Sequence, residues 1–199
     1  MKGMIIVLAG PSGAGKGRIC EELLKKRENI RKVISVTTRK RREDDLGKET
    51  YNFVTEEEFL YMKEQTMFLE TNNYDGAWYG TLKVPTEELI ERDLIFDKDV
   101  NGAIAIKHMY PEAITIYVMP KDNETLLKRR GNRGKHRAEI AVQEIPKAKK
   151  LDFLIINDDI DEAVGQVEQI IECMREHSII QIWSMTDERN IDFMNNFYN

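Results

Sequence analysis

The sequence predicts an α/β layered fold with a central parallel sheet, because short apolar runs alternate with longer segments of helical periodicity. The first run, residues 4–9, contains no polar residue, which is typical of a strand buried on both faces. The length of 199 residues suits one domain, which buries roughly 70% of the surface that its unfolded chain exposes. We therefore expect residues 1–199 to form a single domain.

The elements follow from these patterns in chain order. Apolar runs predict strands at residues 4–9, 33–36, 94–96, 114–118 and 153–156. Helical periodicity predicts helices at residues 18–27, 86–92, 101–108, 121–129 and 160–175. Residues 37–81 break the alternation with charged residues, glycines and short segments such as 51–54, so we expect an inserted small subdomain there.

Composition and charge restrict the kind of partner. The net charge of −5 does not suggest a surface for nucleic acid or anionic membrane, whereas basic clusters at residues 39–42 and 128–137 suggest small anionic ligands. The apolar run 4–9 is far shorter than the roughly 20 residues that a membrane span needs. Cys20 and Cys173 are too few and too far apart for a disulfide framework or a metal site, so we expect a cytoplasmic protein.

A glycine-rich loop follows the first predicted strand and precedes the first predicted helix. Its sequence, GPSGAGK, matches the spacing G-x-x-x-x-G-K. Glycines let successive backbone N–H groups turn toward phosphate oxygens, and the following helix offers its positive end. The loop therefore predicts a site for a nucleoside triphosphate, and the alternative is a glycine-rich turn with a solvated lysine. The expected ligand-binding residues are Gly10, Pro11, Ser12, Gly13, Ala14, Gly15, Lys16 and Gly17.

The residue after the loop lysine departs from the usual pattern. A serine or threonine commonly stands there and coordinates Mg²⁺ through its hydroxyl, but this chain has Gly17 followed by Arg18. A metal ion must then be held in another way. Asp97 ends the apolar run 94–96, which places a carboxylate at the edge of the sheet where α/β folds bind ligands, so we expect it to contact Mg²⁺ through water.

A second basic segment suggests a second phosphate site. Arg39 and Arg42 are three residues apart in the segment SVTTRKRR, Tyr51 follows twelve residues beyond Arg39, and Tyr79 lies in WYGT. Arginine presents a fork of donors that matches a terminal phosphate, and a phenol adds a further donor. The alternative for the arginines alone is a solvated basic loop.

The order of motifs resembles that of the guanylate kinases, a family of P-loop nucleoside monophosphate kinases. From Gly10 to about Asp159 the motifs are GPSGAGK, SVTTR with a second arginine three residues on, Y-x-F-V-T-x-E-E-F, F-L-E, Y-G-T, D-x-D-x-x-G-A, R-x-x-x-R-G and I-x-N-D-D. The resemblance implies a three-layer P-loop NTPase fold that transfers the γ-phosphoryl group of ATP to GMP with Mg²⁺. It also implies a core of about residues 1–36, 82–127 and 146–177, a GMP-binding subdomain of about 37–81 and a small lid of about 128–145. Residues 178–199 form a C-terminal extension without a counterpart.

The same resemblance assigns the acceptor site. It implies that Arg39, Arg42, Tyr51 and Tyr79 bind the GMP phosphate, that Glu70 and Asp99 recognise guanine, and that Ser35 and Thr81 contact the O6 side of the ring. Ionised carboxylates suit this role, because guanine presents N1–H and an amine as donors. Glu70 and Asp99 taken alone would be interpreted as surface carboxylates.

The resemblance also implies that Arg129 and Arg133 close over the triphosphate and are catalytic together with Lys16 and Arg39. They are four residues apart, so on a helix they share one face. Gln143 stands where the family has a further arginine, and Arg137 is a candidate substitute. Asn157 resembles a residue near the adenine of ATP, with a turn-forming asparagine as the alternative.

Two other functions remain open from the sequence. One is a guanylate-kinase-like binding module with decayed nucleotide sites, which Gly17 and Gln143 favour slightly and the intact arginines and tyrosines oppose. The other is a P-loop kinase for a different small acceptor, against which Glu70 and Asp99 argue. The sequence makes no prediction of oligomeric state.

Overall fold

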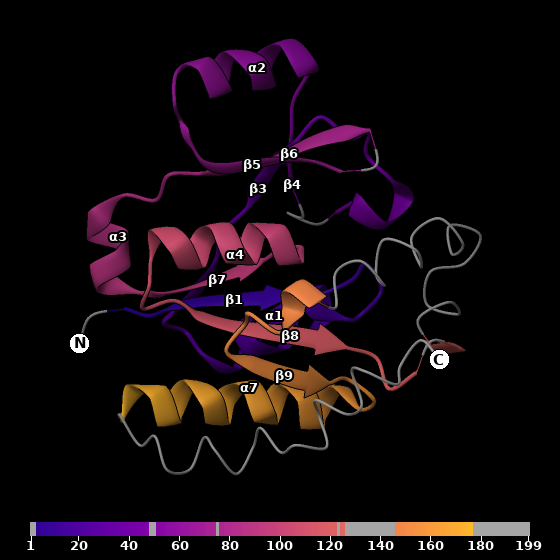
Figure 1. Cartoon of the computed structure of the whole chain (residues 1–199), viewed down its shortest axis with the longest axis vertical. Helices are drawn as coiled ribbons and strands as arrows, with labels where there is room; N and C mark the ends of the chain where they lie inside the picture. Colours follow the sequence, from indigo (N-terminus) through magenta and orange to yellow (C-terminus); the bar gives the residue numbers. More distant parts are fainter. Residues whose placement is uncertain (1–2, 48–50, 75, 123, 126–145, 177–199) are drawn as a thin grey trace.

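The structure, a computed structural model, describes residues 3–47, 51–74, 76–122, 124–125 and 146–176. Two sheets account for the strands of these residues. One is a five-stranded parallel sheet and the other is a smaller four-stranded sheet that lies above it in Figure 1. The α/β fold with a central parallel sheet is therefore as predicted.

The larger sheet has the strand order β2-β7-β1-β8-β9, and every neighbouring pair is parallel. Its central strand is fully buried because helices cover both faces. Side chains alternate between the faces of a strand, and a strand covered on both sides therefore reads as a continuous apolar run. The strands are β1 (Ile5–Ala9), β2 (Ile30–Lys32), β7 (Asp93–Asp97), β8 (Ile114–Met119) and β9 (Phe153–Ile156).

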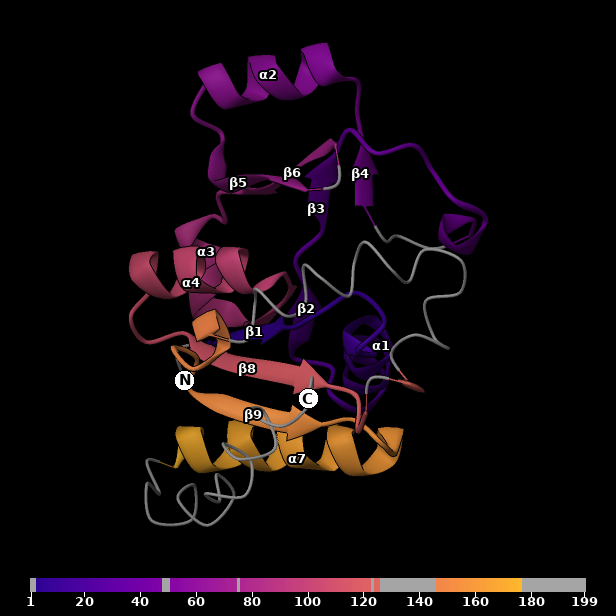
Figure 2. The same ribbon diagram turned by 45° about the vertical axis from the view of Figure 1, so that its right-hand side comes forward.

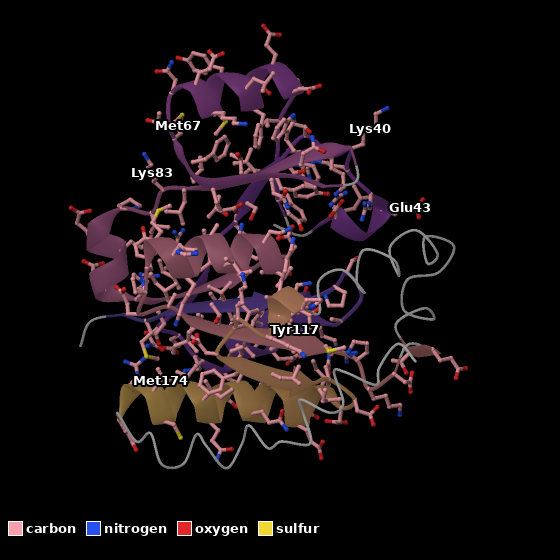
Figure 3. The ribbon with its side chains drawn as sticks, in the orientation of Figure 1. Lys40, Glu43, Met67, Lys83, Tyr117 and Met174 are labelled. Atoms are coloured by element: carbon pink, nitrogen blue, oxygen red, sulfur yellow. The ribbon has the colours of Figure 1, made fainter. Side chains whose placement is uncertain are left out.

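Helices form a layer on each side of this sheet (Figure 2). Ile6 and Leu8 of β1 pack with α1 (Lys16–Lys26) and α7 (Ile160–Arg175) on one side. Val7 packs with α4 (Val100–Met109) on the other side, where α3 (Thr86–Glu91) also lies. Tyr117 and Met174, labelled in Figure 3, belong to these opposite sides. The core is therefore divided by the sheet into two apolar clusters.

The smaller sheet has the order β4-β3-β6-β5 and is mixed, with β3 parallel to β4 and antiparallel to β6. Phe59 of α2 stacks on Phe68 and Trp78, with ring centroids 4.6 and 5.9 Å apart, so the helix covers the sheet through aromatic contacts. Thr55 and Glu58 begin this helix with a reciprocal pair of capping hydrogen bonds. The elements are β3 (Ser35–Thr37), a 3₁₀ turn (Glu43–Asp45), β4 (Tyr51–Phe53), α2 (Glu56–Glu64), β5 (Phe68–Tyr74) and β6 (Ala77–Leu82).

Most predicted elements lie within two residues of their observed bounds, but the strand predicted at residues 33–36 is wrong. The chain forms β2 before Val33 and β3 from Ser35, and these strands belong to different sheets. Val33 still donates its backbone N–H to Ile95 of β7, after which the chain crosses to the smaller sheet. The apolar pair at 33–34 therefore marks a crossing between sheets. Helix α2 and strands β5 and β6 were not predicted.

Other predictions lie partly or wholly outside the described residues. The helix predicted at 121–129 is described only at residues 121–122 and 124–125, of which Glu124 and Thr125 are helical. The lid at 128–145 and the extension at 178–199 lie outside the described residues. Within the described ranges, no helix combines the length and the apolar character that a membrane crossing requires.

Candidate active site

The glycine-rich loop joins the carboxyl end of β1 to the first turn of α1. Gly13 and Gly15 have φ values of 89° and 97°, in the left-handed region that favours glycine. Gly10 has a φ of 136°, and a Cβ atom there would lie 2.2 Å from the carbonyl oxygen of Val118 in β8. The loop can therefore follow this path beside the sheet only with glycine at these positions. Its backbone N–H groups and the N-terminus of α1 suit an anion.

Lys16 begins α1 and its side chain is folded back along the loop. Its ammonium donates to the backbone carbonyl of Gly10 at 2.7 Å and to that of Pro11 at 3.2 Å. The same nitrogen lies 3.6 Å from Oδ1 of Asp97. These neutral carbonyl acceptors can be exchanged for phosphate oxygens, which are charged and form stronger hydrogen bonds.

Asn157 supports the loop from behind. It follows β9, is buried, and donates from its side-chain amide to the carbonyl of Ala14 at 2.7 Å. This bond ties the edge strand of the sheet to the phosphate loop. Ala14 is itself fully buried in the cluster between the sheet and α1, so the loop is held by packing as well.

Asp97 is the last residue of β7, as the apolar run predicted, and its carboxylate is one-quarter exposed. Gly17 faces it, since a Cβ atom on Gly17 would lie 3.7 Å from Oδ2 of Asp97. Among the residues that the structure describes, no three His, Cys, Asp or Glu side chains form a metal cluster. One carboxylate is nevertheless compatible with Mg²⁺, which usually keeps several waters and takes substrate phosphates as ligands.

The predicted acceptor-phosphate residues come from three segments of the smaller sheet. Arg39 follows β3, Tyr51 begins β4 and Tyr79 lies in β6. The Arg39 guanidinium carbon lies 5.2 Å from the centroid of the Tyr51 ring, and the rings of Tyr51 and Tyr79 are 5.8 Å apart. Burial, and then the charge of Asp97, raises the pKa of the Tyr51 phenol well above its usual range, so the phenol stays protonated and able to donate.

Asp45 holds the phosphate side of the site together in this structure. Its carboxylate accepts both arms of the Arg39 fork, at 2.8 and 3.1 Å, and the backbone N–H of Arg42 at 2.7 Å. The carboxylate is almost fully buried. Lys40 and Glu43, labelled in Figure 3, mark the outer side of the loop that carries these groups. A carboxylate and a phosphate both offer an arginine a pair of acceptor oxygens. Asp45 therefore occupies the Arg39 donors that an acceptor phosphate could use.

The predicted base-recognition residues also lie together. Thr81 of β6 donates from its hydroxyl to Oε1 of Glu70 on β5 at 2.5 Å. Asp99 caps α4 by accepting the backbone N–H of Gly102 at 2.7 Å, and its other oxygen accepts from the amide of Asn72 at 2.7 Å. Two carboxylates thus reach the same region from the two sheets.

Lys98 lies between these groups. Its ammonium, from a side chain that is 7% exposed, donates to Ser35 Oγ at 2.6 Å, contacts Thr81 Oγ1 and lies 3.2 Å from Oε1 of Glu70. Burial lowers its pKa, and the charge of Glu70 opposes the shift. Sequence reasoning missed Lys98, Asn72 and Asp45. For Lys98, the sequence does carry a signal, because the lysine stands between Asp97 and Asp99. A cation between two acidic residues is suited to a polar site.

The two groups of residues face one cleft with a volume of about 450 Å³. The larger sheet supplies the phosphate loop, Lys16 and Asp97, and the smaller sheet supplies the arginines, the tyrosines and Glu70. Pro11, Ala14 and Asn157 are buried in the phosphate loop or behind it, and Thr81 is buried in β6 of the smaller sheet. Arg129 and Arg133 lie outside the described residues. The predicted site residues that line the cleft are Gly10, Ser12, Gly13, Gly15, Lys16, Gly17, Ser35, Arg39, Arg42, Tyr51, Glu70, Tyr79, Asp97 and Asp99.

A loop shaped for nucleotide phosphates, opposite a second group of arginines, tyrosines and carboxylates, defines the class of protein. It is a P-loop kinase whose acceptor is itself a small phosphorylated molecule. The comparisons agree and are more specific. The sequence model of the guanylate kinase family matches residues 2–174.

Individual relatives extend this finding. The chain is 37% identical over 179 residues to a guanylate kinase of Carboxydothermus hydrogenoformans, covering 85% of this chain and 88% of the relative. It is 35% identical over 184 residues to a guanylate kinase of Thermotoga maritima, covering 88% and 89%. The crystal structure of guanylate kinase from Anaplasma phagocytophilum superposes with a TM-score of 0.73 at 29% identity and covers 86% of each chain. The chain belongs to the guanylate kinase family, whose members are nucleoside monophosphate kinases.

Proposed function

We propose that this protein transfers the γ-phosphoryl group of ATP to GMP, giving ADP and GDP. The observation that carries the proposal is the single cleft lined by the phosphate loop from one sheet and by Arg39, Tyr51 and Glu70 from the other. In the reaction, the bond from the γ-phosphorus to the β–γ bridging oxygen breaks. A new bond joins that phosphorus to an oxygen of the GMP phosphate, and the bridging oxygen leaves with ADP. Such a reaction depends mainly on positioning and on neutralising charge.

The donor half of the site consists of the loop and its support. Gly10 to Gly17 bind the triphosphate through backbone N–H groups, and Lys16 moves from the carbonyls of Gly10 and Pro11 to the β- and γ-phosphates. Asn157 contributes through the loop that it holds and lies beside the adenine. Arg129 and Arg133, in a lid of about residues 128–145, are assigned to the phosphoryl group in flight.

The acceptor half is assigned to a GMP-binding subdomain of about residues 37–81. Arg39 and Arg42 bind the GMP phosphate, with donors from Tyr51 and Tyr79. Glu70 and Asp99 accept from the N1–H and the amine of guanine, while Ser35 and Thr81 face its O6. The core, about residues 1–36, 82–127 and 146–177, carries the donor half, and closure of the two parts around both substrates excludes water.

We assign Mg²⁺ to the neighbourhood of Asp97, held through water. The carboxylate lies 3.6 Å from the Lys16 ammonium at the mouth of the phosphate loop, and Gly17 leaves the space beside it open. When bound, the ion neutralises charge on the β- and γ-phosphates. We also assign the protein to the cytoplasm, because Cys20 and Cys173 are buried thiols without a disulfide.

The test measures ADP release in a coupled assay with GMP, AMP, dGMP, UMP and CMP as acceptors. We expect GMP to be turned over with the highest kcat/KM, and absence of turnover with GMP refutes the proposal. A Glu70→Ala variant should weaken GMP binding far more than ATP binding in calorimetric titrations. Lys107→Met, at the far side of α4 where Lys107 pairs with Asp152, is the matched control and should leave both affinities unchanged.

A further inference from the structure

We propose that Lys98 fixes the donor and acceptor pattern of the acceptor-base pocket, and that it thereby commits the pocket to a purine with an oxo group at position 6. The inference deepens the proposed function and rests on it. Lys98 lies at the centre of the pocket without being one of the residues expected to touch the base. It is a positioning residue, acting through Ser35, Thr81 and Glu70.

Lys98 sets the role of the Ser35 hydroxyl. A lysine ammonium can only donate, so the hydrogen bond of 2.6 Å from Lys98 occupies the Ser35 oxygen as an acceptor. The hydroxyl hydrogen of Ser35 must then point elsewhere. Ser35 lines the cleft, so the direction available for that hydrogen includes the bound base. Lys98 therefore converts a hydroxyl that could donate or accept into a donor toward the cleft.

Lys98 also sets the hydrogen bonds of Thr81 and Glu70. Thr81 accepts from Lys98 and donates its own hydrogen to Oε1 of Glu70 at 2.5 Å. Glu70 also lies 3.2 Å from the ammonium, so one of its oxygens is fully engaged. An ionised carboxylate is acceptor-only, and Glu70 lines the cleft. Glu70 is thus held by Lys98 and Thr81 through Oε1, and its carboxylate faces the base as an acceptor.

The resulting order of groups matches one edge of one kind of base. A donor at Ser35 next to an acceptor at Glu70 complements an oxo group at position 6 next to N1–H. Adenine presents the reverse, an amine at position 6 next to an unprotonated N1. Sites built from buried, committed hydrogen bonds reject mismatched partners strongly, because a mismatch leaves their polar groups unpaired. Without the lysine, the Ser35 hydroxyl can rotate and accept from an amine.

The experiment compares the wild type with Lys98→Met, which removes the charge and keeps an unbranched apolar side chain. The acceptors are GMP, AMP, 6-thio-GMP and IMP, and kcat/KM is measured for each. We expect the preference for GMP over AMP and over 6-thio-GMP to fall by about 10- to 100-fold in the variant, the range of one charge-assisted hydrogen bond. The ratio of GMP to IMP should change less than these two preferences, because GMP and IMP share the oxo group and the N1–H and differ only at position 2.

The outcomes separate the possible explanations. If Lys98→Met is folded and lowers kcat/KM for all four acceptors equally, the lysine is only structural and the inference is overturned. If the variant does not fold, Ser35→Ala decides, because it leaves the lysine and its carboxylate in place. Ser35→Ala must then lose the same GMP over 6-thio-GMP preference, and an unchanged preference overturns the inference. Failure of the proposed function is distinct, since the wild type itself would then not phosphorylate GMP.

Discussion

Replacing Gly10 with alanine should destabilise the protein and weaken ATP binding together. The backbone at Gly10 has a φ of +136°, and the new Cβ atom would lie 2.2 Å from the carbonyl oxygen of Val118 and 3.2 Å from its carbonyl carbon. Both contacts are to the backbone of β8, which pairs with β1 on one side and β9 on the other. A strand held on both sides cannot give way as a flexible side chain could.

Two costs set the size of the effect. Forcing a residue with a Cβ atom into an unfavourable backbone region costs about 1–3 kcal/mol. Inserting a methyl group into a closely packed position typically costs a further 1–3 kcal/mol. We therefore expect Gly10→Ala to lower the free energy of unfolding by about 2–6 kcal/mol, through these combined terms. The loop must also shift away from β8, which moves its N–H groups relative to the phosphates.

Urea unfolding followed by circular dichroism measures the first effect, and calorimetric titration with ATP measures the second. Gly165→Ala is the matched control, because Gly165 lies inside α7 and a Cβ atom there meets no atom within 4 Å. It should stabilise the protein by up to about 1 kcal/mol, since alanine is the better helix former. A Gly10→Ala protein that unfolds at the wild-type urea midpoint with an unchanged slope would refute the claim that only glycine fits beside Val118.

Two further predictions concern the site, and a third concerns the buried thiol of Cys20. Arg39→Lys removes the pair of guanidinium donors that now holds Asp45. The KM for GMP should therefore rise by about 10- to 100-fold, while the KM for ATP stays nearly unchanged. An equal rise in both KM values would show that Arg39 is not at the acceptor phosphate. A serine at position 17 fits beside Asp97, because its Cβ atom would lie 3.7 Å from Oδ2 of Asp97, an ordinary contact distance. The hydroxyl of Gly17→Ser should lower the Mg²⁺ concentration that gives the half-maximal rate by about 3- to 10-fold. An unchanged Mg²⁺ concentration would place the ion away from residue 17. Burial, and then the charge of Asp97, raises the pKa of the Cys20 thiol from 9.0 to about 12. The contribution of the protonated Cys20 thiol to the free energy of unfolding is therefore full below about pH 9 and is lost as the pH rises toward 12. Cys20→Ala should lessen this decline in stability. Rapid labelling of Cys20 in the native protein at pH 8 would contradict the raised pKa.

The sequence predicted the larger sheet well because burial on both faces leaves an unmistakable pattern. Strand β1 packs against helices on either side, and so every residue in it is apolar. Strand β2 lies at the edge of the sheet with Arg31 exposed, and it gave no such run. Strands β5 and β6 carry polar residues that face the cleft, such as Glu70 and Tyr79, and these broke the alternation that a pattern search needs.

The sequence predicts the parts of the site whose residues are neighbours along the chain, and it does not predict the contacts between residues far apart in the chain. The phosphate loop is one contiguous segment, and its residue types and its place between a strand and a helix are visible in the sequence. Lys98 matters to the site because it contacts Ser35, which is 63 residues away, and Glu70, which lies on the other sheet. Asp45 matters to the site because it pairs with the guanidinium of Arg39. In the sequence alone, Asp45 is one acidic residue near a basic segment, and nothing indicates this pairing. These partners become visible only when the two sheets are folded together.

The pairing of Asp45 with Arg39 also bears on how quickly substrates come and go. The arginine is already partly buried and already holds a carboxylate in fork geometry, so on the proposed assignment an incoming phosphate replaces one anion with another. The affinity gained from Arg39 is then the difference between two similar partners, which is smaller than the strength of either bond. On the proposed assignment, Arg39 selects for a phosphate in the correct place and still binds it weakly enough for the diphosphate product to leave.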